Sequence, residues 1–177
     1  GDALATLQEL DRGLGAFEVR GEWRSVAEAG IAEWNEAVTR AVSAASTEAD
    51  GARPGDAQVI GVVNAFAQDD STVVCAAGGL PGELHKLWRT PGARGYHLEY
   101  GYSCMGYEIA GGLGVKLAAP EREVIVLVGD GSYLMMNSEI ATSVALRRKL
   151  VVVLLDNRGF GCIERLQASC GGDSFNN

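Results

Sequence analysis

The sequence lacks a long hydrophobic run. Its longest uninterrupted apolar stretches, residues 124–128 and 150–155, are far shorter than the roughly 18 apolar residues that a helix needs to cross a bilayer. We therefore expect no membrane-spanning segment and no membrane partner. No secretory signal pattern opens the chain, and a cytoplasmic location is expected.

Cysteine is scarce and is not arranged for metal binding or cross-linking. The chain has four cysteines and two histidines, and they form no CxxC pair and no zinc-like spacing: Cys75, Cys104, Cys162, Cys170, His85 and His97. This pattern disfavours a zinc knot and a disulfide framework. It is typical of a protein that stays in a reducing compartment.

Positive charge is also scarce. The 15 lysines and arginines are outnumbered by 23 acidic residues, which gives a net charge of −8. Bulk charge of this sign disfavours binding to polyanions, so nucleic acid is not an expected partner. The content of 47% hydrophobic and 21% charged residues is close to that of ordinary globular proteins, and 177 residues suit one domain or one domain with a fragment.

The first third of the chain has a helical pattern. Leucines recur at helical spacing over residues 2–14, and a second apolar pattern of this kind covers residues 23–46. A break follows at residues 48–55, which include Pro54. We expect a domain boundary at this break or near Arg20.

From residue 55 onward, predicted helices and strands alternate. Asp56 is expected to cap the first helix, and the glycine-rich stretch before Asn177 carries no final helix or strand signal. The predicted helices cover residues 57–68, 83–88, 105–118 and 132–146, and the predicted strands cover residues 72–76, 96–99, 123–128 and 151–155. The strands are almost continuously apolar, which is typical of a parallel sheet with helices on both faces. The predicted fold class is therefore α/β.

Glycine is abundant, with 24 residues, and three of the predicted strands end in a glycine-containing loop. These loops are residues 78–82, 129–132 and 156–159. In open parallel α/β sheets, ligands bind outside the carboxyl ends of the strands, where such loops gather. The three loops together predict a binding site at this edge of the sheet.

The second loop indicates what the site binds. Asp130 lies between two glycines, and Ser132 begins the next predicted helix, whose free N–H groups favour an anion. A carboxylate beside an anion is repelled unless a cation lies between them, so Mg²⁺ that bridges Asp130 and a diphosphate is the economical hypothesis. The Asn157 amide and the Gly159 carbonyl offer two further oxygen ligands. The alternative is that both segments are ordinary turns.

The segment of residues 129–157, GDGSYLMMNSEIATSVALRRKLVVVLLDN, resembles the GDG…N signature of thiamine diphosphate-dependent enzymes. Asp130 and Asn157 have the separation that this family uses. The resemblance implies that Asp130 and Asn157 ligate Mg²⁺ through their side chains and Gly159 through its carbonyl. Asp156 stands where the family usually has asparagine, and we interpret it as structural.

The resemblance also implies which residues contact thiamine diphosphate. Gly131 and Ser132 would contact the diphosphate, and Gly78 and Gly79 resemble the family's earlier diphosphate loop. The backbone of Ser103 and Met105 would meet the aminopyrimidine ring, Met105 would wedge the cofactor into its V shape, and Met135 would line the same pocket. Taken alone, Met105 is more typical of core packing.

Longer stretches resemble one branch of the family. AAGGLPGELHKLWR, GYHLEYGYSCMGYEIAGGLGVKLA and the segment GGDSFNN are similar to the branch that hydrolyses a C–C bond of a cyclic 1,2-dione in myo-inositol catabolism and opens the ring to a deoxy-sugar acid. An acetolactate synthase-like carboligase is the alternative within the family. A nucleotide or methyl-donor binding domain and a non-catalytic interaction module are alternatives outside it.

The resemblance implies a division of the chain. Residues 1–20 would be the tail of a preceding central domain, residues 21–54 a helical linker region, and residues 55–177 the cofactor-binding domain, truncated at its C-terminal end. The glutamate that activates the aminopyrimidine would belong to an absent domain and reach the site across the interface of a homodimer or higher homo-oligomer. No catalytic residue is therefore assigned in this chain, which we expect to be inactive alone.

Three polar residues are candidates for substrate contacts: His85, His97 and Glu99. A histidine beside a helix is more often a surface or satisfied core residue, and Glu99 is equally suited to hydrogen bonding with the loop that follows it. Cys104 lies next to Met105, but nothing nearby marks it as a nucleophile of lowered pKa.

Overall fold

The computed structural model describes residues 1–43, 53–90, 92–175 and 177. These residues form two compact units, Gly1–Thr39 and Arg40–Asn177. The functional division at residues 20 and 54 remains a prediction. None of the described helices combines the length and the apolar character that crossing a membrane requires.

The first unit is helical, as predicted. Helix α1 spans Ala3–Leu14, and Asp2 caps it by accepting a 2.8 Å hydrogen bond from the backbone N–H of Ala5. Helix α2 spans Gly21–Ser43, so the two predicted helices are confirmed except for residues 44–46, which lie outside the described residues.

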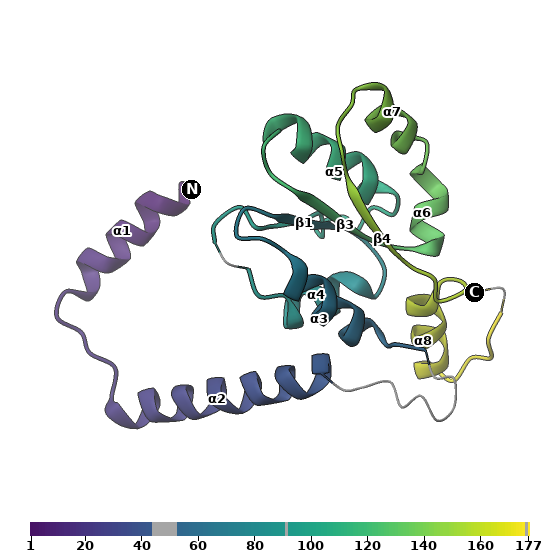
Figure 1. Ribbon diagram of the computed structural model, residues 1–177. Coiled ribbons are helices and arrows are strands. Elements are labelled where there is room, and N and C mark those ends of the chain that lie inside the picture. The colour runs from purple at the N-terminus through teal and green to yellow at the C-terminus, as the bar shows by residue number, and fades with distance from the viewer. Residues whose placement is uncertain (44–52, 91, 176) are drawn as a thin grey trace. The chain divides into compact units, whose positions relative to one another are not determined.

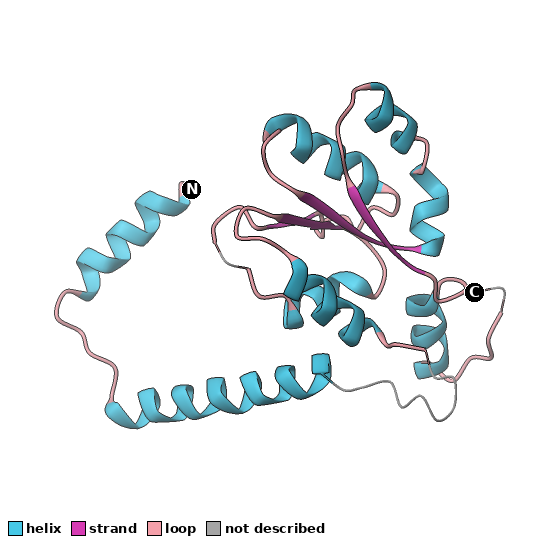
Figure 2. Cartoon of the chain, in the orientation of Figure 1, coloured by secondary structure: helices cyan, strands magenta, loops and turns pink. Residues whose placement is uncertain are grey.

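The second unit is built on a sheet of four parallel strands (Figure 2). The strands are β1 (Thr72–Cys75), β2 (Tyr96–Leu98), β3 (Val124–Gly129) and β4 (Val151–Leu155). Their order in the sheet is β2-β1-β3-β4. The predicted parallel sheet is confirmed.

Helices lie on both faces of this sheet (Figure 1). One face carries α3 (Asp56–Phe66) and α4 (Leu80–Leu87), and the other carries α5 (Tyr107–Ala118), α6 (Asp130–Met136) and α7 (Glu139–Ala145). Parallel strands joined by right-handed crossovers place successive helices on opposite faces when the chain reverses its direction across the sheet. The predicted α/β fold class is therefore confirmed.

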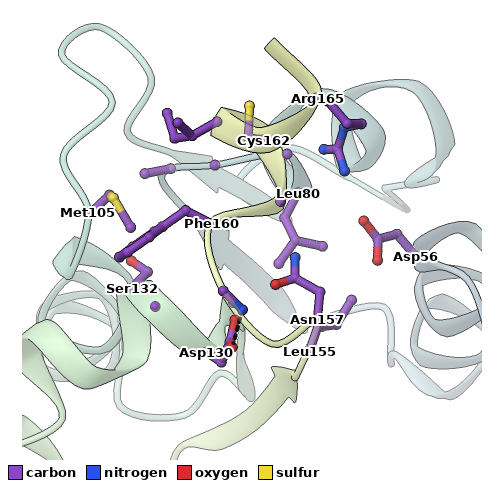
Figure 3. Close-up of a pocket in the computed structure, with 18 of the residues that line it drawn as sticks. Asp56, Leu80, Met105, Asp130, Ser132, Leu155, Asn157, Phe160, Cys162 and Arg165 are labelled. Atoms are coloured by element: carbon purple, nitrogen blue, oxygen red, sulfur yellow. Dashed lines mark hydrogen bonds between the residues drawn. The ribbon is translucent and has the colours of Figure 1, made fainter. Parts of the chain in front are cut away.

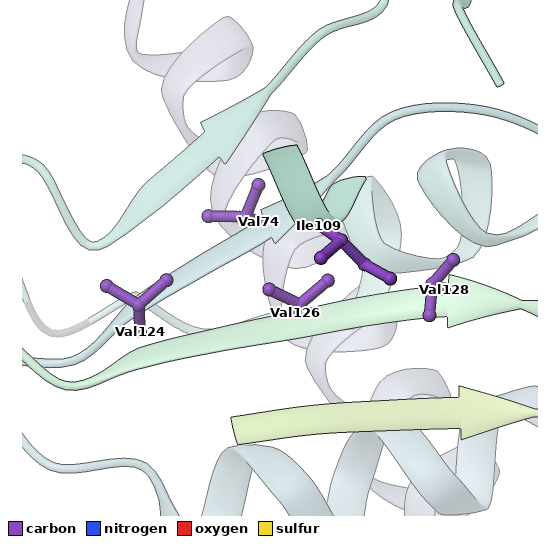
Figure 4. Packing of buried hydrophobic residues seen from close by; sticks show 5 residues of the cluster. All are labelled: Val74, Ile109, Val124, Val126 and Val128. Carbon is purple, nitrogen blue, oxygen red and sulfur yellow. The ribbon is translucent and has the colours of Figure 1, made fainter. Parts of the chain in front are cut away.

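The core lies between α5 and the two central strands (Figure 4). Its fully buried members are Val74, Ile109, Val124, Val126 and Val128. Helix α5 can approach β3 closely because it carries Gly112, where a Cβ atom would lie 2.5 Å from Cγ2 of Val126. This packing fixes the carboxyl ends of the central strands, where the predicted site lies.

Part of the predicted order of elements is wrong. The single helix expected at residues 132–146 is two helices, α6 and α7, which are separated at Asn137 and Ser138. The carbonyls of these two residues accept the N–H groups of Ile140 and Ala141 in short, three-residue turns. Asparagine and serine side chains compete with the backbone for hydrogen bonds, which makes both residues poor at continuing a helix.

Three further expectations need correction. A last helix, α8 (Gly161–Ser169), follows β4 although none was predicted. Asp56 does not cap α3: the N-cap is Gly55, and Asp56 is the first helical residue. Strand β4 was expected to be covered on both faces, but its residue Leu154 is 45% exposed.

Candidate functional site

The order of the strands creates a crevice at one place in the sheet. The chain moves from β1 to β2 on one side and later returns to β3 on the other side of β1, so the loops after β1 and β3 diverge. Such a switch point is where open α/β sheets bind ligands. A cavity of about 340 Å³ lies there (Figure 3).

Nine of the ten cofactor and metal residues predicted from the sequence line this one cavity: Gly78, Gly79, Ser103, Met105, Asp130, Gly131, Ser132, Asn157 and Gly159. They come from the segments that follow β1, β2, β3 and β4. Met135 is the exception among the described residues. Its side chain is 50% exposed, and its Cβ lies 3.3 Å from the place of a Cβ on Gly106.

Asp130, Asn157 and Gly159 meet at the end of β3 and β4. Oδ2 of Asp130 accepts a 2.8 Å hydrogen bond from the backbone N–H of Gly159. One terminal atom of the Asn157 amide lies 3.0 Å from Oδ1 of Asp130 and 2.6 Å from the carbonyl oxygen of Gly159. The two predicted side-chain ligands and the predicted carbonyl ligand therefore converge on one point.

The orientation of the Asn157 amide decides whether this point is a hydrogen-bonded cluster or a set of oxygens that suits a cation. With the amide nitrogen there, Asn157 donates hydrogen bonds to both Asp130 and Gly159. With the amide oxygen there, three oxygens face one another, and only a cation stabilises such a set. Cis ligands at about 2.1 Å from an octahedral Mg²⁺ are about 3 Å apart. The 3.0 Å between the Asn157 and Asp130 atoms matches this spacing, and the 2.6 Å to the Gly159 carbonyl oxygen would have to lengthen when the ion binds.

The loop that carries Ser103 and Met105 is held by Glu99. Its Oε1 accepts from the backbone N–H of Tyr102 at 3.1 Å, and its Oε2 accepts from that of Cys104 at 2.8 Å. These two bonds hold the pKa of Glu99 below its usual value of 4.5, and the bond from Cys104 has the larger effect. The loop-stabilising alternative for Glu99 is thus the one that the contacts support.

Backbone conformation around this loop is unusual. Ser103 has a φ of 51°, which is uncommon for a residue with a side chain, and Gly106 has a φ of 88°. At Gly106 a Cβ atom would lie 2.7 Å from Cγ of Met136. Position 106 therefore requires glycine for two reasons, the positive φ and the lack of space for a Cβ atom. The turn places Met105 at the cavity.

The two histidines do not line the cavity within the described chain. His97 Nε2 lies 2.7 Å from the hydroxyl oxygen of Tyr107, and the two rings stack with centroids 5.9 Å apart. His85 Nδ1 lies 3.5 Å from the hydroxyl oxygen of Tyr96. Both histidines have partners in the fold, so the substrate-contact hypothesis for them gains no support.

Two glycines of the site leave room for particular side chains. A Cβ on Gly131 would lie 2.6 Å from the ring of Phe160, and a Cβ on Gly79 would lie 2.5 Å from the Arg165 guanidinium. Phe160 and Arg165 also line the cavity. The loop after β4 and helix α8 thus close over the loops after β3 and β1.

The sequence did not point to several residues at the site. Asp56, Phe160 and Arg165 line the cavity. Asp56 was expected only to cap a helix, and no role was predicted for Phe160 or Arg165. Glu108 is fully buried beneath it and hydrogen-bonds to three of its loops. A lone acid in the otherwise apolar, glycine-rich stretch of α5 was the signal that could have identified it.

Comparison with known proteins agrees with this geometry. Residues 76–177 match the family model described as thiamine pyrophosphate enzyme, C-terminal TPP binding domain. The chain belongs to the thiamine pyrophosphate enzyme family. The resemblance identified from the GDG…N segment is thereby confirmed. The two alternatives outside the family are not supported.

Several relatives carry the name 3D-(3,5/4)-trihydroxycyclohexane-1,2-dione hydrolase. The protein of Shouchella clausii (strain KSM-K16) is 54% identical over 113 residues, which are 64% of this chain and 18% of that protein. The protein of Geobacillus thermodenitrificans (strain NG80-2) is 52% identical over 128 residues, which are 72% of this chain and 20% of that protein. The chain thus spans about a fifth of the length of these relatives.

A solved structure shows the same fold. The thiamine diphosphate-dependent 4-hydroxybenzoylformate decarboxylase of Rhodococcus jostii RHA1 superposes with a TM-score of 0.63 and 22% sequence identity, over 68% of this chain and 23% of that one. At this identity the likeness concerns the architecture of the thiamine pyrophosphate enzyme domain alone.

Proposed function

We propose that this chain is the part of a thiamine diphosphate-dependent hydrolase that binds Mg²⁺ and the cofactor's diphosphate. The observation that carries the proposal is the convergence of Asp130, Asn157 and Gly159 on one point at the carboxyl ends of β3 and β4. These residues offer one carboxylate, one amide and one carbonyl oxygen. Such a set of hard oxygen donors, with space for phosphate oxygens and water, suits Mg²⁺.

The diphosphate would lie beside this cation, against backbone rather than side chains. Gly131 and Ser132 line the cavity at the start of α6, and Gly78 and Gly79 line it after β1. The Ser132 hydroxyl donates to Glu108, so Ser132 would offer the diphosphate its backbone N–H. Met105 lines the same cavity and would support the ring system of the cofactor.

The cofactor, when bound, supplies the nucleophilic carbon and the electron sink for C–C bond cleavage. The residues of this chain would orient it. Asp130 would hold the metal, whose positive charge would offset the negative charge of the diphosphate, and Phe160, packed over Gly131, would limit the access of water. The glutamate that activates the aminopyrimidine would come from another domain, across a homo-oligomer interface.

The proposed reaction is hydrolytic ring opening of a cyclic 1,2-dione in myo-inositol degradation. Relatives at 52% to 54% identity that carry this hydrolase name support the proposal. An acetolactate synthase-like carboligase is the alternative within the family, and nothing specific to it was found in the cavity within the described residues.

Two assays on the complete protein test the proposal. Calorimetry should detect thiamine diphosphate binding that requires Mg²⁺. The loaded enzyme should then open trihydroxycyclohexanedione and should not form acetolactate from pyruvate. Acetolactate formation without ring opening would favour the carboligase, and failure to bind thiamine diphosphate would reject the proposal as a whole.

A further inference from the structure

Glu108 is a charged side chain that the cofactor site conceals. It lies in the first turn of α5 and is 0% exposed. Within the described part of the chain it forms no ion pair, and backbone and hydroxyl groups provide its hydrogen bonds. A buried carboxylate is costly unless such donors satisfy it, so this arrangement needs a physical reason.

The three donors come from three different segments around the cavity. Oε1 accepts from the backbone N–H of Ala77, just after β1, at 3.2 Å. Oε2 accepts from the backbone N–H of Gly106 at 3.1 Å and from the hydroxyl of Ser132 at 2.7 Å. One carboxylate thus joins the loop after β1, the Met105 turn and the loop after β3.

Ser132 closes this network. Its Oγ accepts a 2.7 Å hydrogen bond from the backbone N–H of Gly106 and donates its own proton to Glu108. The Ser132 hydroxyl is therefore engaged with Gly106 and Glu108 and is not available to hydrogen-bond phosphate oxygens. Ala77 and Gly106 each lie next to a residue that lines the cavity, Gly78 and Met105.

We infer that Glu108 is a positioning residue, which sets the mutual placement of the three loops that would receive the cofactor; the inference rests on the proposed function. Glutamine has the same shape but only one accepting oxygen. Whichever way the amide lies, its NH₂ group faces a backbone N–H of Ala77 or of Gly106. The loops would separate there while the rest of the fold persists.

The experiment is calorimetric titration of the complete protein with thiamine diphosphate at saturating Mg²⁺, at a temperature where every variant is folded. We expect Glu108→Gln to weaken binding by roughly 10- to 100-fold, the range seen when supporting partners of ligand-binding groups are removed. Glu123→Gln is the matched control, because Glu123 precedes β3 at the opposite end of the strand and pairs only weakly with Lys149, at 3.8 Å. It should bind as the wild type does.

A double variant tests whether Glu108 and Ser132 act together in positioning the loops or contribute independently to binding. If Glu108 acts partly through the Ser132 hydroxyl, Ser132→Ala should weaken binding less than Glu108→Gln, and the double variant should bind no more weakly than Glu108→Gln alone. Unchanged affinity in a folded Glu108→Gln protein, or fully additive losses, would overturn the inference.

Amide hydrogen exchange of the cofactor-free wild type tests the same inference without a variant. The N–H groups of Ala77 and Gly106 should be strongly protected, because both donate to a buried carboxylate. Exchange at the rate of open loops would overturn the role of Glu108 even if a variant failed to fold. A wild type that binds no thiamine diphosphate would reject the proposed function, while the exchange result would still report on Glu108.

Discussion

The backbone N–H of Gly159 donates a 2.8 Å hydrogen bond to Oδ2 of Asp130, which lies 29 positions earlier in the chain. The contact follows from the pairing of β3 with β4, in which Gly129 lies opposite Leu155. Both strands end at the same level, so the loops that follow them lie side by side. The bond occupies one carboxylate oxygen of Asp130, and the other faces the Asn157 amide.

The charge of Asp130 should be essential for Mg²⁺-dependent binding. Asparagine keeps the shape and an acceptor for the Gly159 N–H, but it removes the charge that attracts the cation. We expect Asp130→Asn to weaken thiamine diphosphate binding by roughly 100-fold or more in calorimetry. Removing a residue that only hydrogen-bonds to a metal ligand typically costs roughly 10- to 100-fold in affinity, and the loss of a ligand itself should be at least as large.

Asp156→Asn provides the matched control for this variant. Asp156 Oδ1 accepts a 3.0 Å hydrogen bond from the backbone N–H of Arg158, and asparagine forms the same turn. The control should retain wild-type affinity. Equal losses in both variants would mean that negative charge around the loop, rather than a ligand at position 130, governs binding.

Two glycines of α5 should respond to alanine in opposite ways. Gly112→Ala places a methyl group 2.5 Å from Val126 Cγ2 and should lower the free energy of unfolding by about 2 kcal/mol. Gly114 is exposed and has no atom within 4 Å of its Cβ position, so Gly114→Ala should raise that free energy by about 0.5–1 kcal/mol.

Urea unfolding followed by tryptophan fluorescence measures both effects. Trp88 is 7% exposed and reports on the sheet-containing unit, whereas Trp23 and Trp34 are largely exposed already. A Gly112→Ala variant that is as stable as Gly114→Ala would show that α5 does not lie against β3 as closely as described.

The four cysteines should differ sharply in reactivity. Burial, with a smaller contribution from the charge of Glu108, raises the pKa of Cys75 to about 12. At about pH 8 its thiol stays protonated and is not nucleophilic. Cys104, Cys162 and Cys170 are exposed free thiols.

Alkylation of the native protein with iodoacetamide, followed by peptide mass spectrometry, measures this difference. Label should appear on the exposed cysteines and reach Cys75 only after denaturation. Prompt labelling of Cys75 in the native state would contradict the burial of β1.

The loop that carries Ser103 should loosen in acid. Hydrogen bonds from the Cys104 and Tyr102 N–H groups lower the pKa of Glu99 in the folded chain. Because the pKa is lowered, the stabilisation is present above the unfolded-state value and is lost as pH falls through the folded-state value. Carboxyl NMR shifts should show Glu99 titrating below 4.5, the usual value.

Glu99→Gln tests the loop directly. The variant should abolish the acid-dependent change in exchange of the Tyr102 and Cys104 amides, since the amide oxygen of glutamine does not titrate. An unchanged pH dependence in the variant would assign the effect to another group.

The loops of the site could be predicted because each follows a strongly apolar strand. Strands 124–128 and 151–155 are nearly all valine and leucine, so their ends, and hence Asp130 and Asn157, were clear from the sequence. The separation of these two residues then matched the family signature. Their spatial meeting follows from strand pairing alone.

Helix α8 and the break at Asn137 were harder to predict. None of the residues of α8 is buried, and Ile163 and Leu166 remain 52% and 61% exposed, so hydrophobic periodicity gave little signal. The break depends on local competition of Asn137 and Ser138 for backbone groups, which an apolar pattern does not record. Glu108 was missed because an acid in a helix is ordinarily placed on the surface.

The most direct test of the account is a crystal structure of the complete protein with thiamine diphosphate and Mn²⁺ in place of Mg²⁺, examined by anomalous scattering. The account predicts one peak within about 2.5 Å of Oδ1 of Asp130, the Asn157 amide oxygen and the Gly159 carbonyl oxygen. A peak elsewhere, or an Asn157 amide whose nitrogen still faces Asp130 in the loaded protein, would contradict it.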